Sequence, residues 1–279
     1  MKKLFVYILL FVLPIGNIHS QETNSCGITN TSFKAGEKLR YSAYFRWGIL
    51  QLSSFSIQSE VKRERYKGES VFAITTTGVT AGNMDKFFTI RDTLHAKLKV
   101  NDLQPLYFKE IANEEKFKAT REFKYDYTDS TRVSWQFADN KNKEKAGNTT
   151  LTNCAYDAVS IIYRLRNYDF NAETLKPNQT FRIDYFSDGK SSPLQMRFEK
   201  KEIVTLKNGD RYDCLKFELE VAEGTLFKNN ERVFIWITND KNRLIAYVEA
   251  KLKIGYVKMD LVNVEHHRHP LTAKLEPVR

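Results

Sequence analysis

Few of the residues that could carry catalytic or metal chemistry lie in patterns that support it. The chain has five histidines, and three of them gather in the motif HHRH at 266–269, immediately before Pro270. Metal ligands must converge in a fixed geometry and be held by oriented neighbours, whereas a segment so close to the chain end is expected to fray. His95 falls within an expected strand, where a structural role is the simpler interpretation. We therefore expect no metal site and no cofactor.

Nucleophile and nucleotide motifs are missing from the sequence. It contains no G-x-S-x-G, no H-E-x-x-H, no P-loop and no G-x-G-x-x-G pattern. Glycoside hydrolysis needs only two carboxylates, so an enzyme acting on glycans stays open. Among the strand and turn carboxylates, we expect Glu37, Glu110, Asp184 and Glu218 to be solvated or paired with Lys and Arg. We predict no catalytic residue.

The three cysteines point to one disulfide and one free thiol in an oxidising compartment. They are Cys26, Cys154 and Cys214, and the sequence leaves their pairing open. Cys214 lies in the segment YDCLKFELEV, on the opposite face of an expected strand from Leu215 and Phe217. No C-x-x-C occurs, which argues against thioredoxin-like or zinc-ribbon chemistry. A buried structural cysteine is expected for at least one of the three.

Aromatic residues form the remaining candidate site. Residues 36–47 alternate strictly between apolar and polar side chains, which predicts a half-buried strand. The apolar run VFIWI at 233–237 predicts a strand covered on both faces. We expect aromatic residues of these two strands to share a concave surface, either as the ordinary core or as an apolar cleft for an acyl chain or another hydrophobic ligand. The five candidates are Tyr41, Phe45, Trp47, Phe234 and Trp236.

The first twenty residues have the parts of a secretory signal peptide. Lys2 and Lys3 form the charged region, an apolar run of about twelve residues follows, and Ser20 offers a small residue for cleavage. A membrane span needs about twenty apolar residues, so cleavage is favoured over an uncleaved anchor. Cys26 is preceded by ETNS, which does not fit a lipoprotein. We expect a soluble, non-lipidated protein exported to the periplasm, with no transmembrane segment after cleavage.

Composition describes a strand-rich chain that can bury a sizeable core. Aromatic residues make up 13% of the 279 residues, and the formal net charge is +10. Aromatic side chains favour strands. The basic residues mostly alternate with acidic ones and form no arginine-rich arm, so we do not expect nucleic acid as a partner. A lipid or another envelope component stays open as a partner, and we expect a monomer.

Alternating and apolar runs predict a mainly antiparallel β protein. Short turns separate the runs, including SDGK at 187–190 and NDKN at 239–242. Strands joined this tightly are most simply antiparallel, and the meander over 224–264 is expected to form the floor of the sheet. The polar segment 138–150 predicts a charged surface loop. The expected strands cover residues 36–47, 49–61, 71–78, 93–100, 106–113, 117–127, 133–137, 181–186, 194–205, 212–221, 233–237, 244–252 and 256–264.

One segment, from Asn153 to Tyr168, predicts a long helix. Apolar residues from Ala155 to Leu165 recur at helical spacing. Asn153 can cap the N-terminus, and Arg164 lies toward the C-terminal end, where a positive charge suits the helix dipole. So broad an apolar stripe must pack on the sheet.

These patterns predict one fold class: a large antiparallel sheet, an open or half β-barrel, or two packed sheets, with one long helix. The expected organisation is a signal peptide at 1–20, an N-terminal extension at 21–32, a single β-rich domain at 33–264 and a tail at 265–279.

Four stretches of the chain also carry a family resemblance. They read FKAGEKLRYSAYFRWGIL at 33–50, YDAVSIIYRLRNYDF at 156–170, YDCLKFELEV at 212–221 and IWITNDKNRLIAYVEAKLKIGYVKMDL at 235–261. In this order they resemble family 3108 of the domains of unknown function, common in exported proteins of the Bacteroidetes. The resemblance implies a periplasmic β-rich protein, with an open barrel like those of lipoprotein carriers, and no known activity. One departure is Asn239 in TND at 238–240, where an acidic pair is expected.

Three hypotheses of function follow. The leading one is non-catalytic binding of a hydrophobic or envelope-derived ligand. The alternative is a structural or protein-interaction module of the envelope that uses exposed sheet edges. An enzyme acting on glycans is the third.

Overall fold

The computed structural model describes residues 26–47, 50–80, 82, 85, 88–220, 232–252 and 255–276. The expected signal peptide lies outside the described residues, as do residues 21–25 of the expected extension. In the strand segments at 45–47, 50–54, 252 and 255 the backbone is described and the side chains are not.

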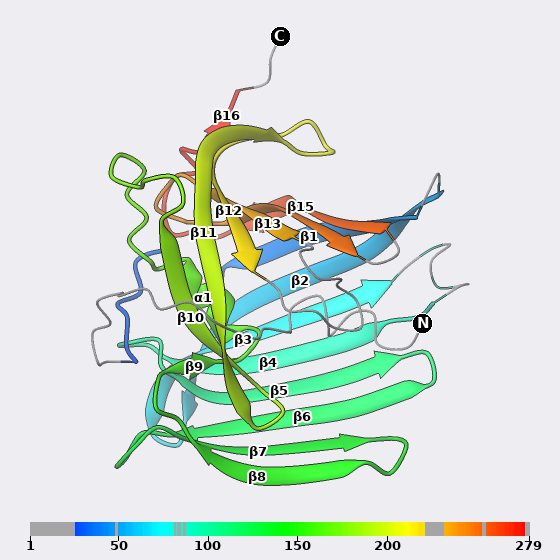
Figure 1. Cartoon of the computed structure of the whole chain (residues 1–279), viewed down its shortest axis with the longest axis vertical. Helices are drawn as coiled ribbons and strands as arrows, with labels where there is room; N and C mark the ends of the chain where they lie inside the picture. The colour runs from blue at the N-terminus through cyan, green and yellow to red at the C-terminus, as the bar shows by residue number, and fades with distance from the viewer. Residues whose placement is uncertain are drawn as a thin grey trace.

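One sheet accounts for all the strands of the described residues, as Figure 1 shows. Its order is β8-β7-β6-β5-β4-β3-β2-β1-β15-β14-β13-β12-β11-β10-β9, with β16 added beside β12. Every pairing is antiparallel except that of β9 with β10. The predicted antiparallel sheet is confirmed. The strands are β1 (Lys38–Trp47), β2 (Leu50–Tyr66), β3 (Glu69–Thr80), β4 (Arg91–Lys99), β5 (Pro105–Glu114), β6 (Phe117–Asp126), β7 (Arg132–Asp139), β8 (Glu144–Thr150), β9 (Ala155–Tyr156), β10 (Thr180–Ser187), β11 (Lys190–Thr205), β12 (Arg211–Glu220), β13 (Arg232–Thr238), β14 (Ile245–Leu252), β15 (Gly255–Glu265) and β16 (Lys274–Leu275).

The sheet is open but curls so that its two edges approach each other near the β10–β11 turn. The chain passes from β8 at one edge to β9 at the other through residues 151–154 alone, a connection that spans at most about 18 Å. Thr149 of β8 donates a hydrogen bond to the carbonyl oxygen of Gly189, in the turn between β10 and β11, at 2.8 Å. The indole of Trp135 lies against Gly189, where φ is +80° and a Cβ would collide with the ring. A glycine is therefore required where the edges approach.

The helix in the curve of the sheet is short. The prediction of one long helix over 153–168 is wrong, because α1 spans only Ser160–Leu165. Its N-terminus is held by Asp157, whose carboxylate accepts hydrogen bonds from the backbone N–H groups of Val159 and Ser160. Residues 155–156 form β9 instead. The apolar residues on both sides of the helix are buried in the sheet, so the broad apolar pattern did not mark a helix boundary.

The predicted surface loop at 138–150 is also wrong in part, because β8 occupies its second half. Asp139 shapes the preceding turn by accepting hydrogen bonds from the backbone N–H groups of Lys141 and Lys143. The strand runs along the edge of the sheet and its residues are mostly exposed. A polar edge strand lacks the apolar alternation by which strands are recognised.

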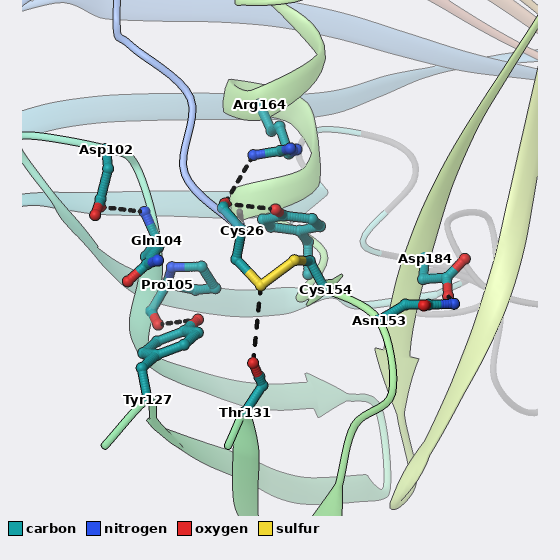
Figure 2. The surroundings of a disulfide bond; sticks show 11 residues. Cys26, Asp102, Gln104, Pro105, Tyr127, Thr131, Asn153, Cys154, Arg164 and Asp184 are labelled. Carbon is teal, nitrogen blue, oxygen red and sulfur yellow. Dashed lines mark hydrogen bonds between the residues drawn. A yellow bond between two sulfur atoms is a disulfide. The ribbon is translucent and has the colours of Figure 1, made fainter. Parts of the chain in front are cut away.

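A disulfide joins the start of the described chain to β9. Cys26 and Cys154 are bonded across 128 residues, and Cys214 is free and buried. The expectation of one disulfide and one buried free thiol is confirmed. Figure 2 shows that the carbonyl oxygen of Cys26 accepts a hydrogen bond from Arg164 of α1, at 2.9 Å. The N-terminal segment is thus anchored to both the sheet and the helix.

A buried ion pair holds the C-terminal end of α1 in place. The guanidinium of Arg166 makes two parallel hydrogen bonds to the carboxylate of Glu37, at 2.6 and 2.8 Å, and a third to the carbonyl oxygen of Asn242. Both side chains are at most 1% exposed. Burial disfavours the guanidinium charge, but the Glu37 carboxylate more than offsets this and raises the pKa of Arg166. The pair links the segment before β1, the helix end and the β13–β14 turn.

The C-terminal segment is docked rather than frayed. Asn242 in the β13–β14 turn accepts a hydrogen bond from the backbone N–H of His269 and donates to its carbonyl oxygen. Arg268 donates to the carbonyl oxygen of Asn30 at 2.8 Å. Beyond these contacts β16 pairs with the start of β12. The expectation that the tail frays is wrong, because its polar groups find partners in turns that the sequence does not place near it.

Breaking the buried pair should cost far more than breaking an exposed one. We expect Glu37→Gln to lower the free energy of unfolding by about 3–5 kcal/mol, because it leaves the Arg166 charge buried without its counter-ion. The exposed pair of Lys38 and Glu60 provides the control, and Glu60→Gln should cost about 0–1 kcal/mol. Urea unfolding measures both values. Equal costs would contradict the role given to the buried pair.

Reduction of the disulfide should destabilise the fold by about 2–5 kcal/mol, because the free thiols no longer restrict the unfolded chain. The comparison is urea unfolding with and without reductant. A Cys214→Ala variant should keep the full response to reductant, and a Cys26→Ser/Cys154→Ser double variant should lose it. A double variant that still responds would argue against this pairing.

Candidate functional site

A cavity of about 280 Å³ lies between the concave face of the sheet and α1. Most of its lining is apolar. Its side chains come from strands β1 to β6, from strands β10 to β15 and from α1. The lining residues are Leu39, Tyr41, Ala43, Tyr44, Phe55, Ile57, Ser59, Thr76, Gly78, Thr80, Ile90, Asp92, Leu94, Phe108, Glu110, Arg121, Phe123, Ala158, Val159, Ile161, Ile162, Tyr163, Leu165, Tyr185, Leu194, Leu219, Val233, Ile235, Ile245, Val248, Val257 and Met259.

Polar and apolar groups occupy different walls of the cavity. The lining residues from β12, β13, β14 and β15 are all apolar. The charged lining residues are Asp92 of β4, Glu110 of β5 and Arg121 of β6, which are neighbouring strands. This separation suits an amphiphilic ligand, since ligand pockets combine an apolar lining with a few placed polar groups.

The positive charge of Arg121 is neutralised by carboxylates of the protein itself. Arg121 donates a hydrogen bond to Glu110 at 2.7 Å and another to Asp188, in the β10–β11 turn, at 3.3 Å. The ring of Phe137 lies 4.9 Å from the guanidinium carbon. Burial raises the pKa of Glu110, and Arg121 lowers it in part. The guanidinium is therefore engaged on several sides and is poorly placed to receive an anionic ligand.

Asp92 is the charged lining residue without a counter-ion in hydrogen-bonding contact. Its side chain accepts one hydrogen bond, from the backbone N–H of Asn113 to Oδ1 at 2.8 Å. Asp92 is 1% exposed, and within the described chain its Oδ2 atom has no hydrogen-bond partner. Burial raises the pKa of Asp92 to about 6, the hydrogen bond from Asn113 opposes this, and the charge of Glu110 adds to the rise. A buried acceptor in this state is costly to the fold.

Hydroxyl groups line the middle of the cavity. Ser59 of β2 lies 3.0 Å from the hydroxyl of Tyr163 in α1 and 3.0 Å from that of Thr76 in β3. Tyr41 of β1 is buried nearby, and burial raises its pKa. These contacts fix the helix against the sheet.

Tyr41 and Trp236 share one buried hydrophobic cluster, against which Phe234 packs, but they differ in whether they line the cavity. Tyr41 lines the cavity, but Phe234 and Trp236 do not. The indole N–H of Trp236 donates to Glu202 at 2.8 Å, and the ammonium of Lys216 lies 4.3 Å from the ring centre of Phe234. The side chains of Phe45 and Trp47 lie outside the described part of the chain.

The register of β13 explains the difference. Successive side chains of a strand point to opposite faces. In β13 the cavity-facing residues are Val233 and Ile235, so Phe234 and Trp236 face outward. The sequence concealed this, because a strand buried on both faces reads as a continuous apolar run. The signal that was missed is the pair of acidic residues Glu110 and Glu114, which lie on the same face of β5 as the apolar Phe108 and Ala112.

The four carboxylates considered for glycan chemistry are each held by arginine. The expectation that they are solvated or paired with Lys and Arg is confirmed, and in all four cases the partner is an arginine. The pairs are Glu37 with Arg166, Glu110 with Arg121, Asp184 with Arg182, and Glu218 with Arg197 and Arg232.

The histidines make structural contacts. His95 of β4 hydrogen-bonds through Nδ1 to the hydroxyl of Thr75 at 3.1 Å. Nε2 of His269 lies 2.6 Å from the carbonyl oxygen of Thr31, and Nδ1 of His267 lies 2.6 Å from that of His269. Across the described residues, no group of three His, Cys, Asp or Glu could hold a metal ion.

Known proteins are similar to this chain in family and in fold. The model of the family described as "Protein of unknown function (DUF3108)" matches residues 40–262. The chain belongs to the DUF3108 family. No curated protein matches it. The DUF3108 resemblance seen in the sequence is therefore confirmed.

Two solved structures are similar to this DUF3108 chain. One is a β-barrel-like protein of a domain of unknown function, DUF1849, from Brucella abortus, with a TM-score of 0.50 and 11% identity over 84% of this chain and 99% of that one. The other is a protein of Bacteroides fragilis with a YmcC-like fold, described as a candidate exported protein. Its TM-score is 0.37, with 11% identity over 85% of this chain and 99% of that one. The first likeness supports a barrel-like fold. No helix in the described part reaches the length and apolarity needed to cross a bilayer.

The TND segment of this DUF3108 chain is explained by its turn. Asp240 accepts hydrogen bonds from the hydroxyl of Thr238 and the backbone N–H of Asn242, both at 3.0 Å. Asn239 donates to Asp213 of β12 at 2.9 Å. The segment fixes the β13–β14 turn, on which the C-terminal segment docks.

The state of Asp92 predicts a measurable dependence of stability on pH. Its folded pKa of about 6 lies above the ordinary value of 3.8. Between these values the folded state binds more protons than the unfolded state, so stability falls as pH rises through this window. Asp92→Asn removes this loss. The variant should gain about 3 kcal/mol relative to the wild type between pH 4 and pH 7.

Urea unfolding at a series of pH values tests this expectation. Asp126→Asn is the matched control, because Asp126 is exposed and the hydrogen bonds from Thr128 lower its pKa. Its folded pKa lies below the ordinary value, so this variant should instead lose stability above pH 4. A difference between Asp92→Asn and wild type that stays constant from pH 4 to pH 7 would contradict the shift.

Proposed function

We propose that this DUF3108 chain is a non-catalytic binding protein for a hydrophobic or envelope-derived ligand. The observation that carries the proposal is the cavity of about 280 Å³ between the sheet and α1, whose lining is mostly apolar. This space far exceeds the roughly 10–15 Å³ that a cavity needs to hold a single water. An apolar cavity of such size is poorly suited to water and well suited to a hydrocarbon chain.

The contacts that hold the helix over the cavity support the binding role. The curled sheet supplies most of the wall, and the helix is held in place by the Glu37–Arg166 pair and by the contact of Tyr163 with Ser59. A cavity held open by its surroundings costs a ligand little reorganisation on binding.

Export belongs to the same proposal. The Cys26–Cys154 disulfide suits an oxidising compartment, and the N-terminal sequence has the parts of a signal peptide. We propose a periplasmic, non-lipidated monomer that exchanges a lipid or another envelope component.

Two other functions remain as candidates. The exposed edge strand β8 favours a protein-interaction module, because unpaired strand edges can accept a further strand. Glycan hydrolysis has Asp92 and Glu110 on one cavity wall in its favour, but sugars need many polar partners and the opposite wall offers none. We therefore place both after ligand binding.

Native mass spectrometry of the protein purified from the periplasm tests the proposal. A lipid-sized mass should accompany the wild type and be released by denaturing extraction. Ala43→Leu should reduce its occupancy several-fold, because Ala43 lines the cavity and the larger side chain fills part of it.

Ser42→Leu is the matched control, since Ser42 precedes Ala43 on β1 and is not among the cavity-lining residues. Its ligand occupancy should equal that of the wild type. Protein that carries no ligand and also takes up no ten-carbon alcohol, amine or acid would overturn the proposal. Binding that Ala43→Leu leaves unchanged would place the ligand outside the cavity.

A further inference from the structure

We infer that the cavity selects amphiphiles whose head group donates a hydrogen bond, an alcohol or an amine, over those with a carboxylate head. This inference rests on the proposed function and specifies its ligand class. The feature that carries it is the Oδ2 atom of Asp92, a buried acceptor in the cavity wall without a hydrogen-bond partner in the described chain.

The neighbours of Asp92 leave one of its carboxylate oxygens unbound. The residue opposite it on β3 is Gly78, which also lines the cavity and has no side chain to compete for the carboxylate. On the other side, the backbone N–H of Asn113 engages only Oδ1. A ligand group that reaches this part of the wall therefore meets one occupied and one free acceptor oxygen.

The charge balance of the wall sets the sign of the preference. Among the described lining residues Arg121 is the one cation, and it is bound to Glu110 and to Asp188. Asp92 therefore contributes an uncompensated negative charge once ionised. A carboxylate head group would meet like charge in a poorly hydrated site and would have to displace Glu110 to reach a cation.

The opposite wall sets the orientation of the chain. The residues contributed by β12, β13, β14 and β15 are apolar without exception, including Val233, Ile235 and Val248. A hydrocarbon chain placed against them leaves its head group toward β4 and β5, where Asp92 and Glu110 lie. The ligand class that fits both walls is a single hydrocarbon chain with a hydroxyl or ammonium head.

Isothermal titration calorimetry with 1-decanol, decylamine and decanoate at pH 7.5 tests the inference, using the mature protein. The wild type should bind decylamine and 1-decanol at least about tenfold more tightly than decanoate, because hydrogen bonds to a charged partner are among the stronger ones. Asp92→Asn should weaken decylamine binding by about tenfold or more and leave decanoate binding unchanged or tighter. Ala43→Leu should weaken all three, and Ser42→Leu none.

Each result separates this inference from the proposed function. Failure of all three probes to bind the wild type would overturn both. Binding of all three with equal affinity, unaffected by Asp92→Asn, would overturn the head-group preference and leave an apolar binding cavity. Loss of decylamine binding with 1-decanol unchanged would restrict the preference to cations. Urea unfolding of each variant shows whether a change in affinity accompanies a loss of fold.

Discussion

The buried pair of Arg166 and Glu37 is the interaction on which the arrangement of this fold depends. An isolated charge in a protein interior is strongly disfavoured, so each member requires the other and requires partners for its remaining polar atoms. Arg166 meets that requirement by binding Glu37 and the carbonyl oxygen of Asn242. The neighbouring Asn167 accepts hydrogen bonds from the backbone N–H groups of Thr31 and Ser32. The C-terminus of α1 thereby becomes the meeting point of three segments that are far apart in sequence.

This arrangement explains how so short a helix can close a cavity. Six residues of helix have little stability of their own. Here Arg164 ties one side of α1 to the disulfide segment, and Arg166 ties its end to the β13–β14 turn. Tyr163 contacts Ser59 in the sheet. The helix is therefore held by contacts at its sides and end, and the space beneath it is bounded by fixed groups.

Local patterns in the sequence predicted most of the strands, but not the polar edge strand or the extent of the helix. The alternation over 36–47 correctly predicted β1, with Leu39, Tyr41 and Ala43 buried. The helix prediction failed, because residues 155–156 are equally apolar and are buried as β9. The edge strand β8 was missed because its residues are polar.

The candidate site shows the same limit. Tyr41, one of the predicted aromatic residues, lines the cavity. Phe234 and Trp236 lie on the face of β13 opposite to the cavity-lining Val233 and Ile235. That outer face is also covered in part, since Trp236 is 7% exposed and donates a hydrogen bond to Glu202 of β11. A strand covered on both faces shows no polar alternation, so the sequence does not reveal which face lines the cavity. The charged wall at Asp92 depends on register between β3, β4 and β5, which the sequence leaves unspecified.

Asp92 differs from four other buried carboxylates in having no arginine partner. Glu37, Glu110, Asp184 and Glu218 each have an arginine partner. Asp92 is as deeply buried as these residues and has a single backbone donor. An apolar side chain at this position would remove a desolvation cost that the fold otherwise bears. The buried Asp92 carboxylate disfavours folding, so the packing around it does not explain its presence. A ligand that binds the carboxylate from outside the chain explains it better. In this cavity the group that such a ligand must bring is a hydrogen-bond donor.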